Sequence, residues 1–477
     1  MTRSAIVVDA PPDPVAIAQR FAGRAGFAFL HGASDGEYGQ RSFIAVDPIE
    51  SSSAMLPGQP GERGGAPGDT RGDVPRWIGV IPYECGRSLE RLAWTRTPDE
   101  REAPHFMAPV WNRYGAVIDV DPVRGVVRVV GDDARKVAEL ASELRAGPVV
   151  RRARAPVRLE VLPNDDPPEA HLERIRRAKE LIAAGDLYQV NLARRERLRA
   201  VGAPLDLYLA IAEQAPSAFG ACLALGGAVV CASSPELFLD VDVVAGRART
   251  APIKGTRPRG TDAASDAQLA AELDQSDKER AELTMILDVE RNDLGRVCAP
   301  GTVRLQVPPR VDPHPTIHHR AAVLGGILRS GVTSHEVLEA MFPSGSVTGA
   351  PKVRAMEVIA DLEPVRRGLY TGAFGYVTND GSLRLAMAIR VLTIKGGEAH
   401  YYAGGGIVAD SDPAAELAET RWKAAQIERL TGAVAAGPSV SQGGARRRPV
   451  GTGGESAVLV PEKLAAVRDY EEKREGK

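Results

Sequence analysis

The spacing of apolar residues changes along the chain between a helical and a strand period, and these changes predict its elements. Apolar residues recur at i, i+3 and i+4 in residues 15–22, 134–144 and 169–184, which predicts three amphipathic helices. Short runs rich in β-branched and aromatic residues, separated by Gly, Pro and Asn, predict strands. These runs cover residues 27–30, 42–46, 77–83, 110–120, 126–130, 220–225, 228–233, 237–241 and 247–250.

The second half of the chain adds longer helices. A helical tract is expected over 266–297 with an interruption near Asn292, and further helices over 334–341 and 351–361. Residues 308–319, rich in Pro and His, are expected to form a loop. Strands that cluster between helical groups and are joined by short connections favour an α+β fold of two packed, mainly antiparallel sheets with helices outside.

Composition divides the chain into four parts. Residues 1–150 are expected to form a β-rich N-terminal subdomain with a mobile loop at 51–75, where Gly, Pro and Ser dominate. Residues 151–168, rich in Pro and Arg, connect it to the region 169–432. Residues 433–477, rich in Gly, Ser, Pro and Arg, predict a disordered tail.

Charge and composition restrict the classes of partner. Of 477 residues, 44% are hydrophobic and 26% are charged, with 60 Lys and Arg against 62 Asp and Glu, so there is no basic excess for nucleic acid. The longest apolar runs are too short for a membrane span or a secretory leader, and the four scattered cysteines predict free thiols. We expect a cytoplasmic enzyme with a small-molecule partner and no nucleic-acid or membrane partner.

Lys254 is the first candidate for chemistry. It stands between an apolar run and a Gly/Pro turn at 255–258, so its amine is expected to leave the end of a strand on a stiffened loop. A lysine attacks carbon only as the neutral amine, so a nucleophilic role requires a closed, desolvated site. Most lysines are solvated charges, and Lys254 alone does not decide between these roles.

Residues 383–394 suggest a second candidate, because they alternate as one strand would. One face is large and apolar, and the other carries Ala386, Ala388 and Arg390, which leaves space for a ligand and lets the arginine take a carboxylate bidentately. A salt bridge on a half-exposed sheet explains the pattern equally well. The run Gly404-Gly405-Gly406 permits close backbone approach to an anion.

Two further patterns concern anions and cations. Residues 345–352 lead into a helix but lack the ending of a nucleotide-binding P-loop, since Pro351 precedes Lys352, so they suit either a carboxylate site or a simple cap. Two glutamate pairs, each with i, i+3 spacing on one helical face, could together hold Mg²⁺, although such pairs are more often solvated. The pairs are Glu279 with Glu282 and Glu416 with Glu419.

Five segments together resemble the chorismate-utilising enzymes in order and spacing, over about residues 169–430, and residues 77–87 add a looser similarity. The resemblance implies a fold like that of anthranilate synthase component I. The lysine in Pro-Ile-Lys-Gly-Thr is similar to that of aminodeoxychorismate synthase component I, whereas anthranilate synthases usually have alanine there. The segments are Ser234-Pro235-Glu236, Pro252-Ile253-Lys254-Gly255-Thr256, Asp288-x-x-Arg291-Asn292-Asp293, Gly345 to Lys352, and Gly404 to Ser411.

The resemblance implies roles for these positions. Lys254 corresponds to the lysine proposed to add to C2 of chorismate with loss of the 4-hydroxyl, before ammonia attacks C4, and Glu236 corresponds to the acid/base group beside that hydroxyl. The implied Mg²⁺ ligands are Glu282 and Glu419 directly, and Glu279 and Glu416 through water. The implied substrate-binding residues are Gln189, Thr256, His319, Thr348, Gly349, Tyr376, Arg390, Gly404, Gly405, Gly406 and Lys423.

Gln189 separates the chain from the water-using members, the isochorismate and salicylate synthases. They resemble residues 185–191 but carry a lysine at this position, and a neutral amide cannot act as a base on water. Two positions depart from the family: Arg320 follows His319 in place of an aliphatic residue, and Leu30-His31-Gly32 matches poorly the Leu-Glu-Ser element of tryptophan-inhibited members. We therefore do not expect inhibition by tryptophan.

The prediction is Mg²⁺-dependent amination of chorismate to 4-amino-4-deoxychorismate, on the route to 4-aminobenzoate and folate. The sequence has no Gly-x-Cys-x-Gly motif of a glutamine amidotransferase, so ammonia is expected from a separate glutaminase subunit or from solution. Two alternatives stay open: an anthranilate synthase component I, which also eliminates pyruvate, and a non-catalytic regulatory subunit that binds chorismate.

Overall fold

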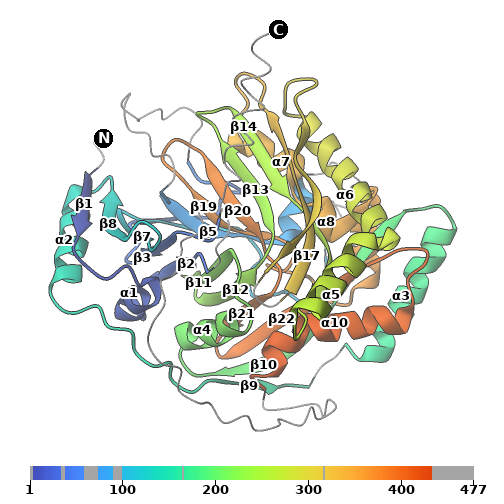
Figure 1. Cartoon of the computed structure of the whole chain (residues 1–477), viewed down its shortest axis with the longest axis horizontal. Coiled ribbons are helices and arrows are strands. Elements are labelled where there is room, and N and C mark those ends of the chain that lie inside the picture. The colour runs from blue at the N-terminus through green and yellow to red at the C-terminus, as the bar shows by residue number, and fades with distance from the viewer. Residues whose placement is uncertain are drawn as a thin grey trace. The chain divides into compact units, whose positions relative to one another are not determined.

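Two large antiparallel sheets organise the chain. The computed structural model describes residues 4–33, 38–58, 74–89, 99–163, 166–314 and 317–431 (Figure 1). The described residues all belong to one compact unit. Every pairing between named strands in the two sheets is antiparallel, which confirms the predicted α+β class with two mainly antiparallel sheets.

Both sheets draw strands from the N-terminal and the later parts of the chain, so the expected boundary near residue 150 does not separate the sheets. Sheet A has the order β1 (Ser4–Val8), β8 (Val126–Gly131), β7 (Ala116–Asp121), β3 (Ser42–Ala45), β2 (Ala28–His31), β11 (Phe219–Leu225), β12 (Ala228–Ser234), β21 (Val391–Lys395), β22 (Glu398–Ile407), β10 (Gln189–Val201) and β18 (Gly349–Ala350), and β9 (Arg158–Val161) pairs with β10. Sheet B has the order β15 (Ile253–Pro258), β17 (Ile317–Ile327), β14 (Arg247–Ala251), β13 (Leu237–Asp242), β20 (Leu383–Met387), β19 (Ala373–Val377), β5 (Trp77–Ile81), β6 (Val110–Arg113) and β4 (Glu50–Ser52), and β16 (Arg304–Pro313) pairs with β17.

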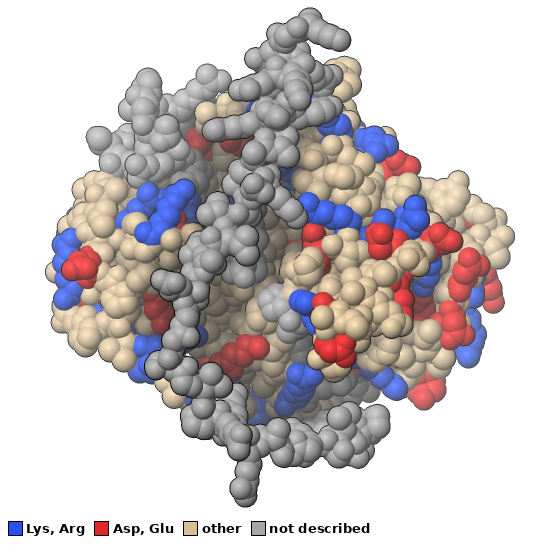
Figure 2. All heavy atoms as spheres, in the orientation of Figure 1, with Lys and Arg blue, Asp and Glu red and all other residues tan. Residues whose placement is uncertain are grey.

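The helices lie outside the sheets, and several gather beside the edge of sheet A that holds β22 and β10 (Figure 1). On the face shown in Figure 2, acidic and basic side chains are interspersed over this group of helices, which agrees with the near balance of charges in the composition. The helices are α1 (Pro14–Phe21), α2 (Ala134–Arg145), α3 (Pro168–Ala183), α4 (Pro204–Gln214), α5 (Ala263–Gln275), α6 (Asp277–Gly295), α7 (Ser334–Met341), α8 (Gly345–Thr348), α9 (Lys352–Leu362) and α10 (Pro413–Glu428), with a 3-10 turn η1 (Tyr83–Ser88).

The core lies between the sheets and beneath the helices. Side chains from sheet A, such as Phe43 and Val230, pack with Val80 and Phe374 from sheet B in one cluster. A second cluster joins sheet A to α1, α2 and α4, and a third joins sheet B to α6 and α7. Because both faces of the central strands are buried, alternation of apolar and polar residues is weak there, and continuous apolar runs replace it.

The predicted single strand over 383–394 is wrong. The chain leaves sheet B after β20 and enters sheet A at β21, and Arg390 in the break has φ of 50°. The second face of this segment is not open for a ligand, since Ala386 and Ala388 are buried in the cluster between the sheets. The alternation that suggested one strand therefore spans two strands in different sheets.

Three other element predictions need correction. The strand predicted over 110–120 divides into β6 in sheet B and β7 in sheet A. The long helical tract breaks at Ser276, not near Asn292, because the Ser276 hydroxyl accepts the backbone N–H of Glu279 and caps α6. The predicted loop over 308–319 is wrong, because residues 308–313 belong to β16 and residues 317–319 to β17. Only His314 lies between the two strands as a described residue, since 315–316 lie outside the described residues. Register shifts between Val307 and Arg310 accommodate the two prolines, which cannot donate to a ladder.

Several expectations from composition meet the structure only in part. Of the expected loop at 51–75, residues 59–73 lie outside the described residues, as does the whole expected tail at 433–477. Three cysteines are buried free thiols, and Cys85 is half-buried. Among the described residues, the structure contains no helix with both the length and the apolar character needed to cross a membrane.

Candidate active site

Lys254 lies at the second position of β15 and not on a loop as the sequence predicted, because β15 continues along β17 where β14 leaves off. The side chain is half-buried, and its Nζ donates a hydrogen bond to the carbonyl oxygen of Ser346, 3.0 Å away. The Lys254 ammonium group lowers the pKa of three nearby carboxyl groups, so its side chain lies among them. These groups are Glu236, Glu282 and Glu419.

Glu236 occupies the connection between β12 and β13 and is 4% exposed. Its Oε1 accepts a hydrogen bond from the Ser346 hydroxyl at 2.6 Å. Burial raises the pKa of Glu236 to about 7, although this hydrogen bond and the ammonium groups of Lys254 and Lys423 oppose the rise. A carboxyl with this pKa holds a proton in part of the molecules at neutral pH, as a general acid must.

His319 reaches the same region from β17, opposite Thr256 in β15. The Thr256 hydroxyl lies 3.0 Å from Nδ1 of His319, while Nε2 is buried with no hydrogen-bond partner among the described residues. Burial holds the pKa of His319 well below its ordinary value, and the charges of Arg390 and His314 act in the same direction. The imidazole is therefore neutral, with one ring nitrogen available to a ligand.

Arg390 joins this group because of the break between the sheets. The Arg390 guanidinium lowers the pKa of His319, and the Glu236 carboxylate opposes the lowering of the Arg390 pKa. The turn between β20 and β21 therefore brings Arg390 close to both side chains. Arg320, the departure noted in the sequence, faces α5 instead and donates to Asp274 at 2.7 Å. It does not occupy the free side of the His319 ring.

Four glutamates reach this cluster from two helices, and each helix carries one i, i+3 pair. Glu279 and Glu282 lie on α6, and Glu416 and Glu419 lie on α10. Burial raises the pKa of Glu282, which the Lys254 charge opposes and the carboxylates of Glu279 and Glu416 increase. The two helices therefore hold like charges near one another, and this is an arrangement that a cation stabilises.

Lysine ammonium groups lie between these carboxylates. Nζ of Lys278 is 3.3 Å from Oε1 of Glu416 and 3.9 Å from Oε1 of Glu282, and Nζ of Lys423 is 2.7 Å from Oε1 of Glu419. In the described part of the chain, no three His, Cys, Asp or Glu side chains are placed to hold a metal ion. The carboxylate oxygens themselves are the donors that Mg²⁺ prefers.

The glycines of β22 let other elements come close. A Cβ at Gly405 would lie 3.1 Å from Oε2 of Glu416, and a Cβ at Gly406 would lie 2.6 Å from Nε2 of Gln189. At Gly404 the carbonyl oxygen accepts a hydrogen bond from Lys423 at 2.8 Å. Larger residues here would push away α10 and the Gln189 amide.

Gln189 carries an unsatisfied buried amide. Its side chain is fully buried at the start of β10, and neither Oε1 nor Nε2 has a hydrogen-bond partner within the described residues. Leaving such a group unpaired costs about 1–3 kcal/mol, so hydrogen bonds from a ligand to this amide would be favourable. The neighbouring strand β18 fixes its backbone, since a Cβ at Gly349 would lie 2.1 Å from the Gln189 carbonyl oxygen.

Thr348 and the start of α9 are less open than the sequence suggested. The Thr348 hydroxyl donates to the carbonyl oxygen of Ser344 at 2.8 Å, inside α8. Pro351 is the N-cap of α9 and is not in its first turn, and Nζ of Lys352 pairs with Oδ2 of Asp293 at 2.5 Å. The segment therefore shapes one wall of the site with groups that already have partners.

Tyr376 lies away from the cluster. It packs against Phe43 between the sheets and lines a separate cavity of about 250 Å³, together with His31 and Arg384. Tyr370, six positions earlier, is the tyrosine that reaches the site: a Cβ at Gly404 would lie 2.9 Å from its hydroxyl. Alternation within β19 turns Tyr376 toward the interior, whereas Tyr370 precedes the strand.

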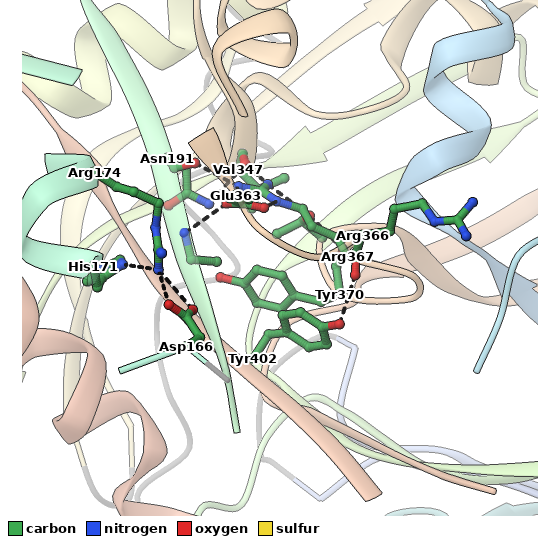
Figure 3. A network of polar contacts seen from close by, with 12 residues as sticks. Asp166, His171, Arg174, Asn191, Val347, Glu363, Arg366, Arg367, Tyr370 and Tyr402 are labelled. Carbon is green, nitrogen blue, oxygen red and sulfur yellow. Dashed lines mark hydrogen bonds and ion pairs between the residues drawn. The ribbon is translucent and has the colours of Figure 1, made fainter. Parts of the chain in front are cut away.

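A buried arginine, Arg367, joins the segment that contains Val347 to the strand that contains Asn191 (Figure 3). Arg367 is 1% exposed, and its guanidinium donates twice to Glu363, at 2.9 and 2.6 Å. It also donates to the carbonyl oxygens of Val347 at 3.1 Å and Asn191 at 2.7 Å, and to the Thr371 hydroxyl at 3.2 Å. All five N–H donors of an arginine are used, so α8, β10 and the end of α9 are joined at one point.

Neither this network nor Tyr370 was identified from the sequence. The i, i+4 spacing of Glu363 and Arg367 was visible, but such pairs are common on exposed helices and indicate nothing about burial. The network matters for the site because the carbonyl oxygen of Val347 also accepts the Asn191 side-chain amide at 3.0 Å. It thereby ties the segment that contains Ser346 and Thr348 to the strand that contains Gln189.

Taken together, the two packed antiparallel sheets and the cluster of lysine, carboxylates, arginine and an unpaired amide define an enzyme for a small anionic substrate. Residues 41–429 match the model of the chorismate binding enzyme family. The chain belongs to this family and is therefore a chorismate-utilising enzyme.

Relatives of two names match the chain. It is 38% identical over 373 residues to anthranilate synthase component 1 of Thermus thermophilus, covering 75% of this chain and 78% of that protein. It is 36% identical over 343 residues to aminodeoxychorismate synthase component 1 of Klebsiella aerogenes, covering 72% and 74%. Among solved structures, anthranilate synthase component I of Streptococcus pneumoniae TIGR4 aligns with a TM-score of 0.67 at 25% identity, over 82% of this chain and 92% of that one.

Proposed function

We propose that the protein aminates chorismate with ammonia to 4-amino-4-deoxychorismate through a covalent intermediate on Lys254. The observation that carries the proposal is the position of Lys254 in β15, where its amine lies among Glu236, Glu282 and Glu419 and contacts α8. Relatives named component 1 suggest a separate partner subunit, which we propose supplies ammonia from glutamine.

In the proposed reaction, the Lys254 amine forms a bond to C2 of chorismate, both ring double bonds shift, and the 4-hydroxyl leaves. Glu236 gives that hydroxyl a proton, so that it departs as water; a buried carboxyl with a pKa of about 7 suits this step. Ammonia then bonds to C4, both double bonds shift back, and the bond to Lys254 breaks. The attacking nitrogen finally loses its extra proton.

Other residues bind and orient the substrate in this proposal. Arg390 and the neutral His319 lie on the side of Glu236, where a carboxylate of chorismate would meet a guanidinium. Gln189 supplies an amide whose two polar atoms lack partners within the described ranges. Because an amide is not a base, this position favours ammonia over water as the nucleophile.

We also propose that Mg²⁺ binds between α6 and α10. Glu282 and Glu419 would be direct ligands, with Glu279 and Glu416 acting through water, and the ion would hold the ring carboxylate. The mutual effect of these carboxylates on the pKa of Glu282 supports a cation here. The lysines that lie between them must then move aside or share the site.

The test is incubation with chorismate, Mg²⁺ and an ammonium salt, with and without added aminodeoxychorismate lyase. We expect 4-aminobenzoate only when the lyase is present. Anthranilate formed without the lyase would overturn the proposal in favour of an anthranilate synthase component I. That second candidate is supported by the relatives of that name, which match at similar identity and length.

A further inference from the structure

Glu290 is a buried carboxyl that the proposed reaction does not use directly. It lies on the inner face of α6 and is 1% exposed. No cation lies within ion-pair distance of it in the described residues. Burial raises the pKa of Glu290 to about 8, an effect that Glu236 and Asp293 increase and that hydrogen bonds from Ser344 and Thr250 oppose. Glu290 is therefore mainly protonated at neutral pH.

A continuous line of hydrogen bonds joins Glu290 to Glu236. The Ser344 hydroxyl lies 2.8 Å from Oε1 of Glu290 and 3.0 Å from the Ser346 hydroxyl, which lies 2.6 Å from Oε1 of Glu236. The two serines are 1% and 5% exposed, so every member of the line is buried. Each distance is that of a hydrogen bond.

The local sequence explains why the line is continuous. Ser344 caps α8 and accepts the backbone N–H of Ser346 at 3.1 Å, which places both hydroxyls on one side of the short helix. Gly345 between them lets α8 approach α6, since a Cβ there would lie 2.7 Å from a methyl group of Val289. The serines therefore bridge α6 and the β12–β13 connection.

We propose that Glu290 is a positioning residue that keeps a proton available to Glu236 through the hydroxyls of Ser344 and Ser346. With Glu290 protonated, each group can donate to the next: Glu290 to Ser344, Ser344 to Ser346, and Ser346 to the Glu236 carboxylate. The inference rests on the proposed function, because it concerns the acid that protonates the departing hydroxyl.

The proposed transfer balances. After Glu236 has given its proton to the 4-hydroxyl, which leaves as water, one proton moves along each hydrogen bond of the line. Ser346 protonates Glu236, Ser344 protonates Ser346, and Glu290 protonates Ser344, so both serines end neutral and Glu290 ends as a carboxylate. The reverse shift takes up the proton released when the newly attached ammonium group becomes an amine.

The charges around the two ends differ in sign. Lys254, Lys423 and Arg390 face Glu236 and favour a carboxylate there. Asp293 faces Glu290 and disfavours a carboxylate there, although Lys352 pairs with Asp293 and reduces its effect. The shared proton therefore rests at the Glu290 end and is drawn to Glu236 only when that group has lost its own.

Glu290→Gln tests the proposal, because the amide keeps the size and hydrogen bonds of the side chain but has no acid proton to give. At saturating chorismate, we expect kcat to fall about 10- to 100-fold while KM changes less than about twofold. The high-pH limb of the kcat profile, where the acid loses its proton, should move to lower pH, from the pKa of Glu290 toward that of Glu236.

Two further variants separate transfer from structure. Ser344→Ala breaks the line but keeps both carboxyls, and we expect the same displacement of the high-pH limb. Thr250→Val removes a hydrogen bond to the other oxygen of Glu290, 3.2 Å away, without touching the line, so it is the matched control and should leave kcat within about twofold. Unchanged kcat and pH profile in folded Glu290→Gln and Ser344→Ala would overturn the proposal.

Infrared titration of buried protonated carboxyls tests the line without turnover. One carboxyl band present at neutral pH should vanish in Glu290→Gln, and in Ser344→Ala its titration should shift, because the hydrogen bond that opposes the raised pKa of Glu290 is lost. A wild-type protein that makes no aminated product would contradict the proposed function only. A Glu290 titration unchanged by Ser344→Ala would contradict the relay.

Discussion

The cluster around Lys254 and the network around Arg367 are both polar, both largely buried and only a few residues apart along α8, yet they are built in opposite ways. In the network every donor of Arg367 has a partner, and the groups it binds are two backbone carbonyls, one carboxylate and one hydroxyl. In the cluster the amide of Gln189 and Nε2 of His319 have no partner within the described residues. Buried polar groups that are hydrogen-bonded within the protein hold its elements together, whereas buried polar groups without such bonds are available to bind a ligand.

The difference is also one of charge. Glu363 and Arg367 neutralise each other at 2.6 Å, so this buried pair is closed to further ligands. Around Lys254, several carboxylates and ammonium groups share a region with partial exposure, and the pKa of Glu236 rises to about 7. Substitutions in the two regions should therefore have different effects. Those around Lys254 should lower activity, and those around Arg367 should lower the free energy of unfolding.

The largest effect is expected from Lys254→Ala. If the amine forms the covalent intermediate, turnover should fall by orders of magnitude while chorismate binding and thermal stability stay close to wild type. Lys254→Arg should not restore activity, since a guanidinium stays protonated. Steady-state rates measure turnover of the two variants, and calorimetry measures their binding of chorismate. Lys395→Ala, at the exposed end of β21, is the control. Near-normal product formation by Lys254→Ala would mean that ammonia attacks directly.

Arg367→Met should have the opposite profile. It leaves the Glu363 carboxylate buried without its partner, so the free energy of unfolding should fall by about 3–5 kcal/mol. Arg366→Ala, one position away with a side chain near the surface, should change it by less than about 0.5 kcal/mol. Denaturant unfolding measures both. Adding Glu363→Gln to Arg367→Met should recover part of the loss, and no recovery would contradict the pairing argument.

Glu282→Gln and Glu419→Gln test whether these carboxylates of the cluster bind Mg²⁺. If these carboxylates bind Mg²⁺, each variant should lose most activity at low Mg²⁺ and regain part of it as Mg²⁺ is raised, because ligand loss weakens binding of the metal. Asp288→Asn, an exposed carboxylate on the same helix α6, is the matched control. Equal loss of activity at all Mg²⁺ concentrations would argue against a metal role.

The smallest effect concerns two tyrosines six positions apart. Tyr370→Phe removes the hydroxyl beside Gly404 and should lower kcat/KM roughly 5- to 10-fold, the worth of about one hydrogen bond. Tyr376→Phe changes a side chain in the cavity between the sheets and should leave kcat/KM within about twofold. A larger fall in kcat/KM for Tyr376→Phe than for Tyr370→Phe would contradict the placement of Tyr376 outside the active site.

How much the sequence could predict depended on whether the signal was local. The helices over 334–341 and 169–184 follow from the spacing of residues that lie close together in the sequence. The motifs with Lys254, Glu236 and the glutamate pairs were found because their residues occur at short, characteristic spacings. Prediction failed at residues 383–394, where an unbroken alternation hid a change of sheet.

By itself, the sequence determined the α+β class, the antiparallel pairing and the residues able to do chemistry, because strand period, helix period and side-chain type are properties of short segments. Only the tertiary structure decided which of these residues meet. It turned Arg390 toward Glu236 and His319, replaced Tyr376 by Tyr370, and placed Ser344 and Ser346 between two carboxyls 54 residues apart in α6 and the β12–β13 connection. These contacts depend on long-range packing and on burial, and burial also shifts the pKa values. Neither can be predicted from a short segment of the sequence.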